Sequence, residues 1–288
     1  MEITYINLVK MIEPYFKDRD FTLYLGDTLE ILNQFEDKKF DLIYADPPYF
    51  LSSGGITCSS GKMVSVNKGE WDKSKGFDED IMFIDSWLKA CKRVLSENGS
   101  IWISGTLHVI YKVGYLLEKN NYDIINDIIW FKPNAPPNLS CKYFTHSHET
   151  VLWARKSKKS SHTFNYEKMK IWNNPKDKLK NKDKQMRSVW SIPLIPKEEK
   201  EFGKHPTQKP LELLNRIISS SSNEGDWVLD PFVGSGTTGI VCSILNRSFV
   251  GIDSNKEYLD VAIKRFKDKR KKELLFSSEK KNHLMKFI

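Results

Sequence analysis

An aspartate, two prolines and a tyrosine, Asp46-Pro47-Pro48-Tyr49, stand directly after an apolar run that favours a β-strand. The lone pair of an aromatic amine is delocalised into its ring, so the nitrogen is a poor nucleophile until acceptors hold both of its N–H protons. Asp46 can supply a carboxylate for this purpose and Pro47 a backbone carbonyl, and the prolines stiffen the turn that aims them. Tyr49 offers a ring on which an extruded base can stack. The motif therefore predicts activation of an exocyclic amino group; the alternative is a strand-ending turn around a buried tyrosine.

A second motif, at residues 227–239, is an apolar strand, a glycine turn and the start of a helix. Gly234 and Gly236 let a ligand approach the backbone, and the following helix offers free N–H groups. Asp253, 23 residues beyond Asp230, ends the next expected strand, where an acid can bind ribose hydroxyls. The glycine spacing suits a dinucleotide, whereas a P-loop would need a lysine that is missing. An adenosyl sulfonium also fits, with Asp230 near its cationic end. Spacing alone leaves these ligands, or a plain packed turn, open.

The elements that would position both motifs alternate between short β-rich runs and amphipathic stretches, which predicts an α/β fold with a parallel sheet flanked by helices. Asn98-Gly99 predicts a left-handed cap at the end of one helix. Two stretches, 50–75 and 156–203, lack the hydrophobic periodicity of a helix or a strand and are expected to be long loops with little regular structure. Strands are expected at 21–25, 40–45, 100–104, 124–131, 227–229 and 248–252, and helices at 29–35, 82–95, 109–120, 210–220, 237–245 and 258–271.

The net charge of +8 is concentrated in residues 155–184 and 264–288, which suits a polyanionic partner, although a lysine-rich solvated surface would give the same pattern. The 288 residues, 40% of them hydrophobic, suffice for one large domain. Four scattered cysteines favour neither zinc nor disulfides. Together with the lack of a signal peptide or a long apolar run, they predict a cytoplasmic protein that binds no membrane and no metal.

The motifs and their order resemble those of the amino-methyltransferases. Asp46-Pro47-Pro48-Tyr49 is similar to their catalytic tetrapeptide, residues 230–238 to their S-adenosylmethionine loop, and His205-Pro206-Thr207-Gln208-Lys209-Pro210 to a further signature. Catalytic tetrapeptide first and cofactor loop last is the permuted β-class arrangement of bacterial DNA methyltransferases, and the resemblance covers about residues 25–266. Residues 45–73 and 135–147 resemble DpnA-type adenine-N6 methyltransferases of restriction–modification systems, whose usual target is GATC. The leading aspartate favours adenine, because the cytosine-N4 enzymes more often carry serine there.

The resemblance implies a Rossmann-like methyltransferase fold in one permuted catalytic domain spanning 1–288. Its catalytic half would be about 20–130 and its cofactor half about 205–270, with a target-recognition insertion at about 132–204 and a mobile loop at about 50–75. The implied function is methyl transfer from S-adenosylmethionine to N6 of a flipped adenine, in GATC, within a bacterial restriction–modification system. The alternatives are a cytosine-N4 DNA methyltransferase and an RNA or protein amide methyltransferase. DNA, double-stranded or single-stranded, is the expected partner, and a homodimer is left open.

The residues expected to act fall into three groups, and Glu149 and Trp153, in a strand-like run, are interpreted as structural. Amides and basic or aromatic side chains in the two loops are candidates for DNA contact, against the alternatives of a flexible surface loop and a self-satisfied turn. The candidates for DNA contact are Lys68, Trp71, Lys73, Asn134, Asn138, Ser140, Lys142, Tyr143 and His146. The catalytic group is Asp46, Pro47, Pro48 and Tyr49. The cofactor group is Asp27, Asp46, His205, Lys209, Asp230, Phe232, Gly234, Ser235, Gly236, Thr237, Thr238 and Asp253.

Overall fold

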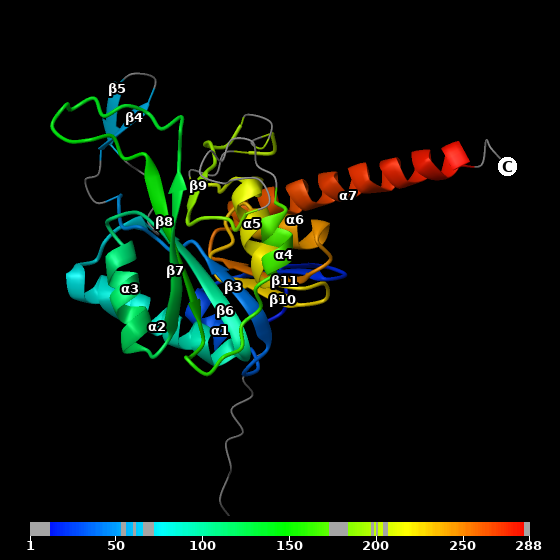
Figure 1. Ribbon diagram of the computed structural model, residues 1–288, viewed down its shortest axis with the longest axis horizontal. Helices are drawn as coiled ribbons and strands as arrows, with labels where there is room; N and C mark the ends of the chain where they lie inside the picture. The colour runs from blue at the N-terminus through cyan, green and yellow to red at the C-terminus, as the bar shows by residue number, and fades with distance from the viewer. Residues whose placement is uncertain are drawn as a thin grey trace, which may run out of the picture.

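The computed structural model describes residues 12–52, 56–59, 62–65, 72–172, 184–196, 199, 201–203 and 207–284. Its centre is a nine-stranded sheet in which most neighbouring strands are parallel and β1 and β8 run antiparallel to their neighbours (Figure 1). The strands follow in the spatial order β1 (Phe16–Asp18), β2 (Phe21–Leu25), β11 (Ser248–Asp253), β10 (Trp227–Asp230), β3 (Phe40–Ala45), β6 (Leu95–Gly105), β8 (His148–Arg155), β7 (Asp123–Phe131) and β9 (Val189–Ser191).

Helices cover both faces of this sheet, as the alternating pattern predicts. One face carries α1 (Thr28–Leu32), α2 (Phe77–Val94) and α3 (Ile110–Lys119). The other carries α5 (Leu211–Ser221), α6 (Thr237–Ile244) and α7 (Lys256–Leu284), while the short α4 (Tyr166–Lys170) contacts α5. In Figure 1 the far end of α7 projects away from the body. The expected α/β architecture is confirmed.

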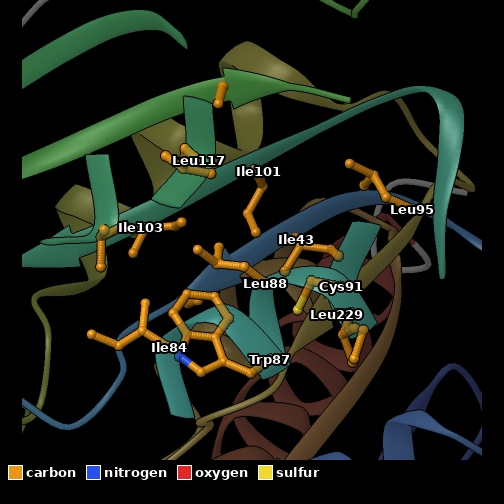
Figure 2. Close-up of a cluster of buried hydrophobic side chains, with 14 of the residues drawn as sticks. Ile43, Ile84, Trp87, Leu88, Cys91, Leu95, Ile101, Ile103, Leu117 and Leu229 are labelled. Carbon is orange, nitrogen blue, oxygen red and sulfur yellow. The ribbon is translucent and has the colours of Figure 1, made fainter. Parts of the chain in front are cut away.

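Each central strand divides its side chains between two hydrophobic cores, because successive residues of a strand point to opposite faces. In β3, Ile43 and Ala45 join the core under α2 and α3, and Leu42 and Tyr44 join the core under α5 to α7. Figure 2 shows the first core, in which Trp87 and Leu88 of α2 lie against the sheet. Burial on both faces explains why these strands are apolar almost throughout.

Several sequence predictions need correction. The left-handed cap at Asn98-Gly99 is wrong: α2 begins at Phe77, ends at Val94, and passes through the extended Leu95 directly into β6. Glycine at position 99 meets a packing need instead, since a Cβ there would lie 2.7 Å from the Leu95 side chain. The other corrections are that 50–75 contains the hairpin strands β4 (Ile56–Ser59) and β5 (Lys62–Ser65), and that 156–203 contains α4 and β9.

The carboxyl ends of β3, β7, β10 and β11 meet at one edge of the sheet, because these strands share one direction. The antiparallel β8 begins at that edge. Residues 46, 132, 149, 230 and 253 are therefore gathered there, where α/β folds bind their ligands.

Gly239 allows α6 to pack closely on the sheet near this edge. The spacing of Gly234, Gly236 and Gly239 in the sequence gives no sign of this packing role. A Cβ there would lie 2.4 Å from the Phe21 ring and 2.5 Å from that of Phe249. Gly239→Ala is therefore expected to lower the free energy of unfolding by about 1–3 kcal/mol, the usual cost of overpacking a core, in urea titrations.

Gly114, in α3, is the matched control, because a Cβ there meets only Leu152 at 3.6 Å. Gly114→Ala is expected to raise stability by about 0.5–1 kcal/mol through helix propensity. A Gly239→Ala protein as stable as wild type would contradict this account of the α6 packing.

Candidate active site

The turn after β3 is held by a buried carboxylate that the sequence does not mark. Asp72 is fully buried and accepts hydrogen bonds from the backbone N–H groups of Tyr49 at 2.8 Å, Phe50 at 2.9 Å and Leu51 at 3.2 Å. The Ser52 hydroxyl donates to the same carboxylate at 2.9 Å. Phe50 adopts a φ of 60°, a backbone angle that residues other than glycine rarely take, so the turn is held in a strained conformation. Asp72 thus fixes where Asp46 and Tyr49 point.

Asp46, the first residue of this turn, lies in a dense polar cluster. Its Oδ1 accepts the Tyr49 hydroxyl at 2.5 Å and its Oδ2 accepts Lys209 Nζ at 2.5 Å, and Lys209 Nζ also lies 3.1 Å from the Tyr49 hydroxyl. The Asp46 and Lys209 side chains are 13% and 6% exposed. Burial raises the pKa of Asp46, and the opposing effect of Lys209 only partly offsets it. Two motifs 163 residues apart therefore meet at one carboxylate.

Glu149, which the sequence analysis interprets as structural, lies in the same cluster. At the start of β8, its carboxylate accepts the Tyr49 hydroxyl at 3.2 Å and Lys132 Nζ at 2.5 Å, and lies 3.6 Å from Lys209 Nζ. Burial acts to raise the pKa of Glu149, but Lys209 and Lys132 outweigh it and lower that pKa to about 2. Glu149 is therefore a negative charge between two lysines. Trp153, on the same strand, is a core residue stacked on Trp102 with ring centroids 4.8 Å apart.

The glycine-rich turn after β10 is also held by carboxylates. Asp230 accepts the Phe232 N–H at 3.0 Å and the Thr238 hydroxyl at 2.5 Å, and burial raises the pKa of Asp230 to about 7. Asp253 accepts the Gly234 N–H at 2.8 Å, and burial raises the pKa of Asp253 to about 6. The two carboxyl groups thus tie the turn to the ends of β10 and β11.

A buried arginine from α7 completes the turn and has no signal in the sequence. Arg265 donates to the Ser235 carbonyl at 2.7 Å and to the hydroxyls of Ser235 and Thr237, each at 3.0 Å. Gly236 has a φ of 78°, and a Cβ there would lie 2.6 Å from that of Ala262. Ser235, Thr237 and Thr238, which we expected to contact the cofactor, therefore have their hydroxyls engaged in shaping the turn.

A cavity of about 200 Å³ lies between the two turns. Asp27 is at its rim as the N-cap of α1, accepting the Leu29 N–H at 2.8 Å. A smaller hollow that shares some of the same walls reaches Lys209, Asp230, Thr237 and Thr238. The cavity thus brings together residues expected from both motifs. Its walls are Asp27, Thr28, Asp46, Pro48, Phe83, Thr207, Pro231, Phe232, Gly234, Asp253, Ser254 and Tyr258.

The candidates for DNA contact are spread more widely. Asn138 and Ser140 bond to each other within the turn, and Asn134 accepts the Leu194 N–H at 2.8 Å, so these three side chains satisfy local groups. Exposed positions are held by Lys73, Lys142, Tyr143 and His146. The remaining candidates, Lys68 and Trp71, and the cofactor candidate His205 lie outside the described residues.

The part of the chain that the structure describes contains no group of three or more His, Cys, Asp or Glu side chains that could hold a metal ion. None of its helices is long and apolar enough to cross a membrane.

Comparison with known proteins gives close relatives. Residues 40–264 match the family model N6_N4_Mtase, described as DNA methylase. The Type II methyltransferase M2.DpnII of Streptococcus pneumoniae is 52% identical over 258 residues, covering 89% of this chain and 93% of that protein. M2.MboI of Moraxella bovis, also a Type II methyltransferase, is 48% identical over 257 residues, covering 88% and 91%.

Solved structures agree in fold. The crystal structure of the M1.HpyAVI–SAM complex is similar with a TM-score of 0.61 at 30% identity, covering 85% of this chain and 98% of that one. PvuII DNA methyltransferase, described as cytosine-N4-specific, has a TM-score of 0.67 at 19% identity and covers 88% and 89%, a likeness of fold alone. The expected Rossmann-like methyltransferase fold is confirmed.

The raised pKa of Asp230 predicts a pH-dependent cost of keeping this carboxylate buried. The folded protein retains a proton there up to about pH 7, whereas the unfolded chain loses it near pH 4. The contribution of Asp230 to stability is thus fully present below about pH 4 and is lost as the pH rises through about 7. Asp230→Asn does not lose this stability as the pH rises, because an asparagine side chain does not titrate. Relative to wild type without cofactor, the variant is expected to gain on the order of a few kcal/mol of unfolding free energy between pH 4 and 8. A difference that stays constant over this range would contradict the account.

Proposed function

The chain belongs to the DNA methylase family, and on that premise we propose that it methylates N6 of an adenine flipped out of the sequence GATC. It is an S-adenosylmethionine-dependent DNA methyltransferase of the kind found in Type II restriction–modification systems. The single observation that carries the proposal is the position of Asp46, whose carboxylate lies at the wall of the cavity beside the glycine-rich turn.

The residues around the cavity fit S-adenosylmethionine. Phe83 and Phe232, with ring centroids 6.3 Å apart, form an apolar wall suited to the adenine, and Asp253 lies where it can accept ribose hydroxyls. Asp230, in the adjoining hollow, provides an acid for the cationic amino-acid end. When bound, the cofactor supplies a methyl group on a positively charged sulfur. The proposed cofactor contacts are these residues with Asp27, Lys209, Gly234 and Gly236, and His205 stays a prediction.

Asp46 and the Pro47 carbonyl are the proposed acceptors for the two N–H protons of the target amine. Holding both protons would direct the nitrogen lone pair out of the ring, so that the nitrogen could take the methyl group directly, without a covalent enzyme intermediate. The methyl–sulfur bond would break as the new bond forms, and the proton lost from the nitrogen would pass to Asp46 or to water. Lys209, held against Asp46 at 2.5 Å, favours the charged form of this carboxylate against the effect of burial. A turn held in a fixed shape before the substrate arrives would be electrostatic preorganisation of these acceptors.

The stacking role expected for Tyr49 has to be refined. Its ring is 4% exposed and its hydroxyl is hydrogen-bonded to Asp46, so it presents no open face in this structure. We propose that the hydroxyl orients Asp46, and that stacking on Tyr49 begins only when a bound base displaces it from this contact. Phe50, partly buried beside it, is the neighbouring aromatic ring.

The choice of adenine and of GATC rests on the resemblance of the catalytic tetrapeptide and of residues 45–73 and 135–147 to DpnA-type enzymes. The fold does not choose between bases, since a cytosine-N4-specific enzyme shares it. The proposed recognition insertion, about 132–204, includes β8, a strand of the main sheet. Among the described residues of this range, the segment 132–147 lies outside the sheet and is the proposed recognition surface.

The proposal is tested with purified protein, tritiated cofactor, and duplexes that differ only in whether they contain GATC. Label in N6-methyladenine of the GATC duplex alone is the expected result, read by nucleoside chromatography. Label in N4-methylcytosine would overturn the choice of base, and equal labelling of both duplexes would overturn the choice of site. Single-stranded oligonucleotides of the same sequence establish which form of DNA is preferred.

Asp46→Ala is expected to lower kcat by a factor on the order of 10² to 10³ or more, because one of the two acceptors for the amine protons is lost. Asp46→Asn removes the charge that pairs with Lys209 but keeps the size of the side chain and an acceptor oxygen, so it separates loss of the charge from loss of the acceptor. Calorimetric titration should show that both variants still bind the cofactor. Substantial activity in Asp46→Ala would contradict the role assigned to Asp46.

A further inference from the structure

We propose that Phe144 is the wedge that enters the DNA stack at the position vacated by the flipped base, an inference that rests on the proposed function. Phe144 is 96% exposed, more than any other large hydrophobic side chain in the part of the chain that the structure describes. Exposing a phenylalanine to water is unfavourable, and nothing in the fold or in the proposed chemistry uses this one. The segment that carries it, 132–147, joins β7 to β8 and projects beyond the sheet in Figure 1.

Hydrogen bonds to one residue hold both neighbours of Phe144. Asn138 Nδ2 donates to the Tyr143 carbonyl at 2.6 Å, and the Asn138 N–H donates to the Thr145 hydroxyl at 3.2 Å. The Asn138 Oδ1 in turn accepts the Ser140 N–H at 3.0 Å. The Tyr143 backbone and the Thr145 side chain are thus tied back to the loop while the Phe144 side chain stays in solvent. A ring presented in this way is ready for insertion with little further ordering.

The base of this segment is part of the proposed active site. The Lys132 N–H donates to the Ser147 carbonyl at 2.7 Å, which closes the loop, and Lys132 Nζ lies 2.5 Å from Glu149. Glu149 contacts the Tyr49 hydroxyl, which donates to Asp46. A duplex whose base reaches Asp46 must therefore lie against the edge of the sheet from which this loop rises. The exposed Lys142, two residues before Phe144, is suited to a nearby phosphate.

The physical need for such a residue comes from the cost of base flipping. Removing a base from a duplex costs a few kcal/mol of stacking and pairing, and an apolar side chain inserted between base steps recovers part of it. The cost is smallest when the target base is already mispaired. The wedge should therefore matter for a matched duplex and matter much less for a mismatched one. A residue that only binds DNA would affect both equally.

The test compares wild type, Phe144→Ala and Phe144→Leu on two GATC duplexes, one fully paired and one with a mismatch opposite the target adenine. Phe144→Ala is expected to lose about tenfold or more in kcat/KM on the paired duplex and less than about threefold on the mismatched one. Phe144→Leu, which keeps an apolar wedge, should recover much of the loss. With 2-aminopurine at the target position, the fluorescence rise on binding should be smaller for Phe144→Ala than for wild type.

Tyr115→Ala is the matched control, because Tyr115 is an aromatic residue on α3 that is 63% exposed and should show no such difference between duplexes. Equal losses on both duplexes, or no loss on either, would overturn the wedge. So would a change of oligomeric state in Phe144→Ala by sedimentation, which would make Phe144 a contact with a second copy. Absence of wild-type methylation on both duplexes overturns the proposed function, whereas wild-type methylation with an unchanged Phe144→Ala ratio overturns this inference alone.

Discussion

The buried ion pair between Asp46 and Lys209 constrains the whole site, because each charge is stabilised there by the other. Isolating a carboxylate or an ammonium group from water costs several kcal/mol, and breaking such a pair leaves that cost uncompensated. Glu149 and Lys132 extend the pair to a network of two negative and two positive charges. Asp46 follows β3, Lys132 follows β7, Glu149 lies at the start of β8, and Lys209 precedes α5. These four parts of the chain must therefore be correctly placed at the same time. The network makes the position of Asp46 a property of the entire carboxyl edge of the sheet.

Most acidic side chains near this edge hold backbone segments in place through hydrogen bonds. Asp72 holds three successive N–H groups after the catalytic turn, and Asp253 and Asp230 hold the turn after β10. Each carboxylate uses charge-assisted hydrogen bonds to fix a loop that would otherwise be free to move. The energetic cost appears in the raised pKa values of Asp230 and Asp253, which burial disfavours as anions. Part of the stability of the fold is thereby given up to hold the two turns that line the cavity.

The sequence predicted six strands of the main sheet, most helices and both turns, because strand periodicity, prolines and glycines are local signals. The strands β1, β4, β5 and β9 were not predicted. It did not predict contacts made across the fold. Glu149 was interpreted as structural because its strand pattern resembles any other, and only the antiparallel return of β8 between β6 and β7 brings it to Tyr49, 100 residues away. Asp72 and Arg265 were missed because their partners are distant backbone groups and small hydroxyls, which form no recognisable pattern in the sequence. The Asn98-Gly99 cap failed because Gly99 is selected by packing against Leu95, not by a left-handed backbone.

Recognition and chemistry share a structural base in this molecule. Lys132 opens the segment 132–147 and Glu149 lies just beyond its end, and the two are bonded to each other and through Tyr49 to Asp46. A loop rooted in this way cannot shift along a duplex without disturbing the charges around Asp46. In the proposed mechanism, contacts of this loop with neighbouring base pairs would therefore also set where the target nitrogen stands relative to Asp46 and the Pro47 carbonyl. Because a displacement of about 1 Å can cost a large factor in rate, a rigid common root is a direct way to make correct recognition a condition of methyl transfer.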